Sequence, residues 1–162
     1  MKKSDKDFSR FLNQELRKNQ GREFAQSRNK FIGEEIISYG VKTKEIRKIV
    51  KRYWKEYPQL KTAKACFTTA EKLTSAKILD NQLAGIFLLG LYQKTSAIKN
   101  VSLLEKLITK NISNWATTDT FASEVLAPVL KNSPKRNDFL YDWANSENIW
   151  LKRAALVTTV KL

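Results

Sequence analysis

The sequence contains few residues that interrupt helices. Three prolines and five glycines are spread over 162 residues, and stretches that alternate apolar with polar residues are nearly absent. A half-buried strand needs that alternation, whereas a helix needs apolar residues three or four positions apart, so the pattern predicts an all-α protein. The length suits one domain with a substantial core, and we expect residues 1–162 to form that single domain.

The apolar periodicity predicts a series of helices joined by short links. We expect them over residues 7–18, 22–38, 44–57, 67–72, 75–94, 101–111, 115–131, 133–144 and 146–157. Gly40 is expected to end the second helix, Thr43 to cap the third, and Ser146 or Asn148 to cap the last. Helix pairs recur about every 35–45 residues, a spacing that fits HEAT-like repeats. We expect an α-solenoid of HEAT-like antiparallel pairs with a concave basic face, and a compact bundle is the alternative.

The charge of the chain points to an anionic partner. Thirty Lys and Arg residues against sixteen Asp and Glu give a formal net charge of +14, which favours a polyanion such as nucleic acid. A solubilising surface is the alternative. Much of the excess lies on one face of the predicted helix 44–57, where Lys44, Lys48 and Lys51 are candidates for DNA binding; a merely solvated face is again the alternative.

Composition also excludes several kinds of chemistry. The sequence has no His and one Cys, Cys66, which removes His-based nucleophile pairs and Cys or His zinc sites. It has no Gly-rich phosphate loop and no acidic cluster with metal-ligand spacing, so we expect no metal and no cofactor. No run of about 18 apolar residues would cross a membrane. The N-terminus lacks the apolar region of a secretory signal, so we expect a cytoplasmic, nucleoid-associated protein.

Two groups of residues are candidates for a functional site. Arg153 has Ile149, Trp150 and Val157 as its helical neighbours, so it projects from a mostly apolar side. It either extends to water or contacts a phosphate or carboxylate in a cleft. Trp115 and Asp119 are four residues apart and share a helix face. Asp119 is either a solvated flank of the apolar stripe or a carboxylate at the mouth of a groove, where the indole would add a cation–π contact.

Three segments carry a family resemblance. They are Tyr39-Gly40-Val41-Lys42-Thr43, Trp115-x-x-x-Asp119, and the stretch Asn148-Ile149-Trp150-Leu151-Lys152-Arg153-Ala154-Ala155. In this order and spacing they resemble the AlkD-like DNA alkylation repair enzymes, which are HEAT-like repeat DNA glycosylases. The resemblance extends from about residue 22 to 162. One departure is Lys44, where the family often has Pro after the Val-Lys-Thr turn.

The resemblance implies a specific activity and specific site residues. The family excises cationic N3- or N7-alkylated purines from duplex DNA without flipping the base into a pocket. Asp119 matches the catalytic carboxylate, Trp115 an aromatic beside the damaged nucleotide's sugar, and Arg153 an arginine that holds the backbone at the lesion. Phe31 and Lys42 fall near other cleft positions, and Trp150 and Lys152 flank the arginine as further DNA-binding candidates.

The resemblance also predicts that the chain is truncated at its C-terminus. Family members usually continue with further helical repeats, whereas this chain stops at Leu162 within an apolar helical pattern. We expect a fragment, a naturally short paralogue, or a chain whose last helix a partner covers. Two other hypotheses stay open beside the glycosylase: a non-catalytic DNA-binding scaffold of the same fold, and a HEAT-type protein-interaction module.

Overall fold

The computed structural model describes residues 5–32 and 36–162, with the backbone alone for residues 5–7. Its elements are α1 (Asp5–Lys18), α2 (Arg22–Ile32), α3 (Thr43–Glu56), η1 (Pro58–Lys61), α4 (Ala63–Thr74), α5 (Leu79–Ser96), α6 (Val101–Asn111), α7 (Trp115–Phe121), η2 (Ala122–Leu126), α8 (Ala127–Leu130), α9 (Arg136–Ala144) and α10 (Ile149–Lys161). Within the described residues, the bridge between Ile37 and Ile78 is the one β-type pairing, so the predicted all-α class is confirmed.

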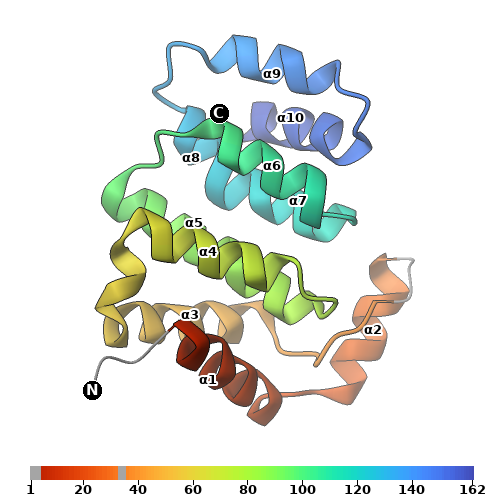
Figure 1. Ribbon diagram of the computed structural model, residues 1–162. Coiled ribbons are helices and arrows are strands. Elements are labelled where there is room, and N and C mark those ends of the chain that lie inside the picture. The colour runs from red at the N-terminus through yellow and green to blue at the C-terminus, as the bar shows by residue number, and fades with distance from the viewer. Residues whose placement is uncertain (1–4, 33–35) are drawn as a thin grey trace.

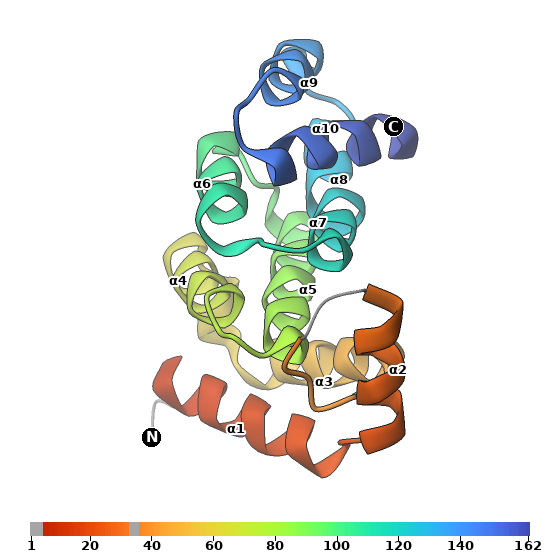
Figure 2. The ribbon, with the colours of Figure 1, turned by 90° about the vertical axis from the view of Figure 1, so that its right-hand side faces the viewer.

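The helices form a stack of antiparallel pairs. Figure 1 shows the stack running from α1 and α3 at one end to α9 and α10 at the other. Figure 2 shows α5, α7 with α8, and α10 on the same side of the stack as α3, and neighbouring members of this set contact one another. The arrangement is solenoid-like, as the spacing of helix pairs predicted. The functional site described below is built on this column of helices.

Helix α5 forms the centre of the core. All of its residues from Leu79 to Gly90 are buried, and from Leu83 to Gly90 every one of them is apolar or glycine, so the helix is enclosed on all sides. Its start was predicted too early, because Ser75 is the C-cap residue of α4. A short link joins α4 to α5, and the carbonyl of Ala76 in this link accepts from the side chain of Gln82 in α5 at 2.9 Å.

The second predicted helix is shorter than its periodicity indicated. Helix α2 ends at Ile32, and positions 33–35 of the predicted range lie outside the described residues. From Ile36 the chain runs beside the start of α5, where Leu79 N donates to Ile37 O at 2.9 Å. The carboxylate of Asp80 accepts hydrogen bonds from the backbone N–H groups of Tyr39 and Val41, at 2.8 and 3.0 Å. This long-range partner satisfies two backbone N–H groups in the connection between α2 and α3.

The predicted helix caps are partly confirmed. Asn148 caps α10, where its side chain accepts from Trp150 N and Leu151 N at 3.0 Å. Thr43 does not cap α3; it is the first helical residue, and the N-cap residue Lys42 makes no side-chain cap bond. The helix predicted to begin at residue 133 begins instead at Arg136.

The backbone conformation at position 40 requires a glycine. Its φ is +72°, and its N–H donates to Ser38 Oγ at 2.9 Å. It therefore does not end α2 as predicted, but forms a left-handed turn in the connection to α3. A Cβ at this position would overlap the carbonyl oxygen of Gly21 and lie 2.7 Å from Ala25 N.

We expect Gly40→Ala to destabilise the fold by about 2–4 kcal/mol, from the unfavourable φ together with the overlap. Chemical denaturation would measure the change. The matched control is Gly21→Ala, whose added Cβ would find its nearest atom, Gly40 O, at 3.2 Å; it should change stability by about 1 kcal/mol or less. Equal effects of the two variants would contradict this account.

In the described part of the chain, none of the helices has the combination of length and apolar character that crossing a membrane requires.

Candidate functional site

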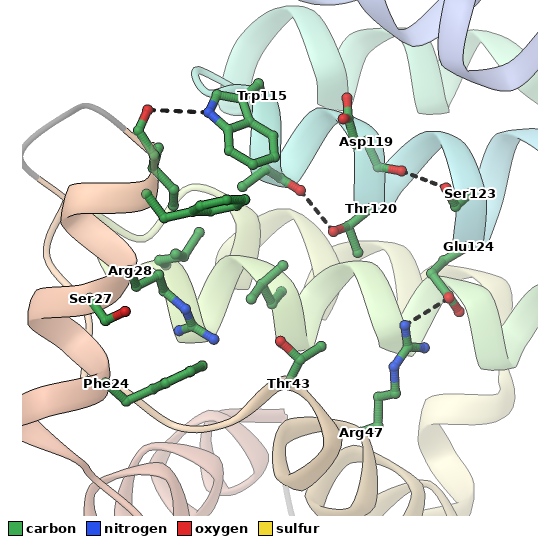
Figure 3. A pocket seen from close by; sticks show the side chains of 15 residues that line it. Phe24, Ser27, Arg28, Thr43, Arg47, Trp115, Asp119, Thr120, Ser123 and Glu124 are labelled. Atoms are coloured by element: carbon green, nitrogen blue, oxygen red, sulfur yellow. Dashed lines mark hydrogen bonds and ion pairs between the residues drawn. The ribbon is translucent and has the colours of Figure 1, made fainter.

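A cleft of about 500 Å³ opens between α2, α3, α5 and α7 (Figure 3). Phe24 and Arg28 project into it from α2, and Arg47 reaches across from α3 toward η2. Trp115 and Asp119 come from α7. Residues from distant parts of the chain thus meet at one place, on the column of helices α3, α5 and α7.

Local sequence explains how α7 presents its two candidate residues. The side chain of Asn114 caps the helix by accepting a hydrogen bond from Thr117 N at 2.9 Å, and this bond fixes where the first turn starts. Trp115 and Asp119 then lie one turn apart on the same face. Thr117, Thr118 and Phe121 are buried, while Trp115 and Asp119 are partly exposed at the cleft. The i, i+4 relation inferred from the sequence therefore agrees with the geometry.

The indole of Trp115 is held by the end of α2. Its Nε1 donates to the carbonyl oxygen of Ile32 at 3.2 Å, across a sequence separation of 83 residues. The ring of Phe31 meets it edge-on, with centroids 5.3 Å apart. Phe31 is itself 75% exposed, which is unusual for a phenylalanine. Two aromatic rings thus form an open apolar wall at one end of the cleft.

Asp119 is held by Arg153 from α10. The guanidinium donates through Nε to Oδ1 at 2.6 Å and through Nη2 to Oδ2 at 2.9 Å, a bidentate pair. Its Cζ also lies 5.8 Å from the centroid of the Trp115 ring. The hydrogen bond to Asp119 raises the pKa of Arg153 above its already high ordinary value, so the guanidinium stays charged.

This pair orients the carboxylate more than it stabilises the fold. The side chain of Asp119 is 31% exposed and that of Arg153 is 42% exposed, so water screens the attraction. The two bonds to Arg153 use one acceptor position on each oxygen, and each carboxylate oxygen has a second. Asp119 therefore keeps a fixed orientation and still has acceptor capacity toward the cleft side.

A π-helical turn follows directly after this site. Residues Ala122–Leu126 form η2, in which Ala127 N donates to Ala122 O, five residues back. Pro128 lies just beyond it and has no N–H for an ordinary helical bond, so the wider turn occurs where the regular ladder is interrupted. The predicted helix 115–131 is therefore divided into α7, η2 and α8, an outcome that periodicity alone did not indicate.

The wider turn brings Glu124 into the cleft together with Asp119. Glu124 Oε1 pairs with Arg47 Nη2 at 2.9 Å (Figure 3). The Arg47 guanidinium also lies over the Phe87 ring, 4.0 Å from its centroid. Sequence reasoning missed this second carboxylate–arginine pair. It treated Arg47 only as part of a basic face, and an α-helical wheel places Glu124 well away from Asp119.

A third pair, Arg28 with Asp80, lies at the α2 side of the cleft, where both side chains are almost fully buried. The side chains are 9% and 0% exposed, and Arg28 Nη1 lies 3.1 Å from Asp80 Oδ1. Asp80 also accepts from Ser38 Oγ at 2.8 Å, and Arg28 Nη2 donates to Val41 O at 2.9 Å. Sequence reasoning missed this pair too. The available signal was an acid in the first turn of α5, a few residues before the apolar run that begins at Leu83.

The other predicted site residues are distributed unevenly around the cleft. Phe31 lines it, whereas its described lining does not include Lys42, Lys44, Lys48, Lys51, Trp150 or Lys152. Lys48 pairs with Glu45 at 2.8 Å, and Lys51 lines a neighbouring cavity together with Arg47. Trp150 is half-buried against the core, and Lys152 is exposed. Their roles in DNA binding stay predictions.

The described residues contain no cluster of three or more His, Cys, Asp or Glu side chains that could hold a metal ion. The features present are a helical solenoid-like fold, a strongly positive chain, and a cleft with a fixed carboxylate beside an indole. These features suit the binding of an anionic partner.

The sequence model of the DNA alkylation repair enzyme family matches residues 12–162, so this chain belongs to that family. The match covers all three segments that carried the resemblance, and it assigns the chain to the repair of alkylated DNA. A comparison with curated proteins finds no match.

Proposed function

We propose that this chain is a DNA glycosylase that hydrolyses the bond between deoxyribose and an N3- or N7-alkylated purine in duplex DNA. The observation that carries the proposal is the orientation of Asp119, whose carboxylate is fixed by Arg153 beside the exposed indole of Trp115. The lesion is processed within an open groove, without rotation of the base into a closed pocket. The aromatic wall of Trp115 and Phe31 is exposed enough to suit that arrangement.

The proposed reaction needs little acid–base chemistry. An alkylated purine already carries a positive charge and leaves as a neutral base, so no strong general acid has to protonate it. The absence of His from the chain is compatible with this reaction. What the enzyme must supply is electrostatic stabilisation of the positive charge that develops on the sugar, and a fixed carboxylate supplies it.

Asp119 has two roles in this proposal. Its negative charge stabilises the oxocarbenium-like sugar, and its remaining acceptor positions orient the water that attacks C1′. The water loses a proton to solvent or to the carboxylate, and the sugar is left with a hydroxyl group while the neutral purine departs. Because Arg153 fixes both oxygens, the carboxylate needs little reorganisation as the positive charge develops.

Trp115 and Arg153 position the damaged nucleotide. The Trp115 ring offers its face to the cationic sugar, a contact worth about 1–2 kcal/mol when water is excluded. Arg153 uses two of its five N–H donors on Asp119, and the remaining donors suit a backbone phosphate at the lesion. A phosphate there would offset the arginine's charge and leave the field of Asp119 directed at the sugar.

The direct test is base release from methylated duplex DNA. We expect the purified chain to release 7-methylguanine or 3-methyladenine faster than they are lost spontaneously, with no release of unmodified purines, as measured by chromatography of the free bases. Boiled protein and unmethylated duplex are the controls. Release at the spontaneous rate over a range of protein concentrations would contradict the proposal.

A further inference from the structure

The pair of Arg47 and Glu124 stands between two cavities. Both residues line the cleft that contains Asp119, and both also line a second cavity of about 380 Å³ between α3, α5 and η2. Arg47 and Glu124 are in contact at 2.9 Å (Figure 3). Because both cavities share these two residues, the pair lies at the boundary between them. The side chains are 46% and 22% exposed, so the pair is accessible to a ligand in solution and is held together only weakly.

The second cavity is strongly positive. Three cations line it, Arg47, Lys51 and Lys94, against the single carboxylate of Glu124. The rest of its described lining is uncharged: Phe87, Gly90 and Leu91. This is the composition of a site for an anion with several oxygens, and a phosphodiester fits it, since an arginine fork and neighbouring lysines are common phosphate ligands.

Arg47 is prepared to exchange one anion for another. Its guanidinium lies over the Phe87 ring at 4.0 Å, a stacking contact independent of Glu124. The planar fork can therefore stay in place when its partner changes. Glu124 offers a carboxylate, which resembles a phosphate in the way that it accepts from an arginine fork. In the free protein Glu124 thus occupies the position that a phosphate would take.

We propose that Arg47, Lys51 and Lys94 bind a backbone phosphate of duplex DNA, and that Glu124 blocks this site until the phosphate displaces it from Arg47. Opening the pair joins the two cavities into one groove that leads from Asp119 along α3 and α5. The inference rests on the proposed function only in taking DNA as the polyanion. It assigns the path of the DNA backbone beyond the lesion. It also gives Glu124 a role in weakening the binding of DNA, because Glu124 competes with the phosphate for Arg47.

The experiment measures the affinity for undamaged duplex as a function of salt. With a fluorescein-labelled duplex between about 50 and 200 mM salt, each phosphate contact contributes about 0.9 to the log–log slope. Arg47→Gln should lower that slope by about 0.9 and weaken binding. Glu124→Gln should tighten binding about three- to tenfold and steepen the slope, because Arg47 is then free in the unbound protein.

The double variant decides whether Glu124 acts through Arg47. If it does, adding Glu124→Gln to Arg47→Gln should change the affinity little. The matched control is Glu71→Gln, which removes the same charge from the pair of Glu71 with Lys110, 2.9 Å apart on α4 and α6. Arg47→Lys, which keeps the charge and loses the fork, replaces Arg47→Gln if that variant does not fold.

Two results would overturn the inference: a Glu124→Gln effect that persists in the Arg47 variant, or one no larger than that of Glu71→Gln. The outcome is independent of the proposed activity. If no methylated base is released but the Arg47-dependent gain is found, the glycosylase proposal fails and the phosphate site stands. If bases are released and the salt slopes do not change, the phosphate site fails alone.

Discussion

Asp119→Asn is expected to slow the release of alkylated purines about 10²–10³-fold, the loss seen when one preorganised electrostatic group is removed from an active site. The amide keeps the shape of the side chain and loses its negative charge. Arg153 then has one acceptor and one repelling donor in place of two acceptors, so its guanidinium becomes available to a phosphate. We therefore expect DNA binding to be unchanged or tighter. Single-turnover base release and duplex affinity, measured on the same preparation, would show the separation.

The control for this prediction is Asp142→Asn on α9. Asp142 is exposed, and its replacement makes the same change in net charge away from the cleft. It should leave the excision rate unchanged and affect binding only as far as the general charge does. If Asp119→Asn excises at the wild-type rate, or if both rate and affinity fall together, Asp119 does not stabilise the developing cation.

The second large effect concerns stability. Asp80→Asn should destabilise the fold by about 3–5 kcal/mol, because it leaves the guanidinium of Arg28 with no counter-charge in a buried site. It also replaces an acceptor by an N–H₂ group that faces other donors, including the N–H groups of Tyr39 and Val41. For a chain of this length that corresponds to a melting temperature lower by about 10 °C or more.

The exposed pair of Glu71 and Lys110 is the matched comparison. Its side chains are 50% and 69% exposed, so Glu71→Gln should change the unfolding free energy by about 1 kcal/mol or less. Denaturant titrations of the two variants measure the difference directly. Similar stabilities for Asp80→Asn and the wild-type protein would mean that the hydrogen bonds of Asp80 do not hold the segment from Ser38 to Val41 against α5.

Local signals in the sequence predicted a large part of the fold. The range predicted for residues 101–111 coincides with α6, and Asn148 caps α10, because apolar spacing and a short polar side chain act within one or two turns. The end of the helix predicted over residues 22–38 was wrong, because residues 36–38 are not helical. Asp80, which lies some forty residues further along the chain, accepts from the backbone of Tyr39 and Val41, and periodicity carries no signal of such a long-range contact.

The candidate site was predictable in its members and less so in its contacts. Trp115 and Asp119 could be paired from their spacing, because one turn of one helix sets their relation. The partner of Arg153 could not be read in this way, since α10 and α7 meet only through the packing of the stack. Glu124 was overlooked because the helix was treated as regular throughout, whereas Pro128 is preceded by a wider turn.

Because of the π-helical turn at Ala122–Leu126, the directions of nearby side chains depend on the exact number of residues in this segment. Five residues separate Asp119 from Glu124, a spacing that a regular α-helix places about 140° apart around its axis and that the wider turn brings closer to one side. A deletion of residue 125 or 126 would restore α-helical geometry and keep that five-residue spacing, so the two carboxylates would then face different directions. Alignments that place a gap at these positions therefore compare proteins in which two carboxylates no longer share a groove, even where every neighbouring side chain is identical.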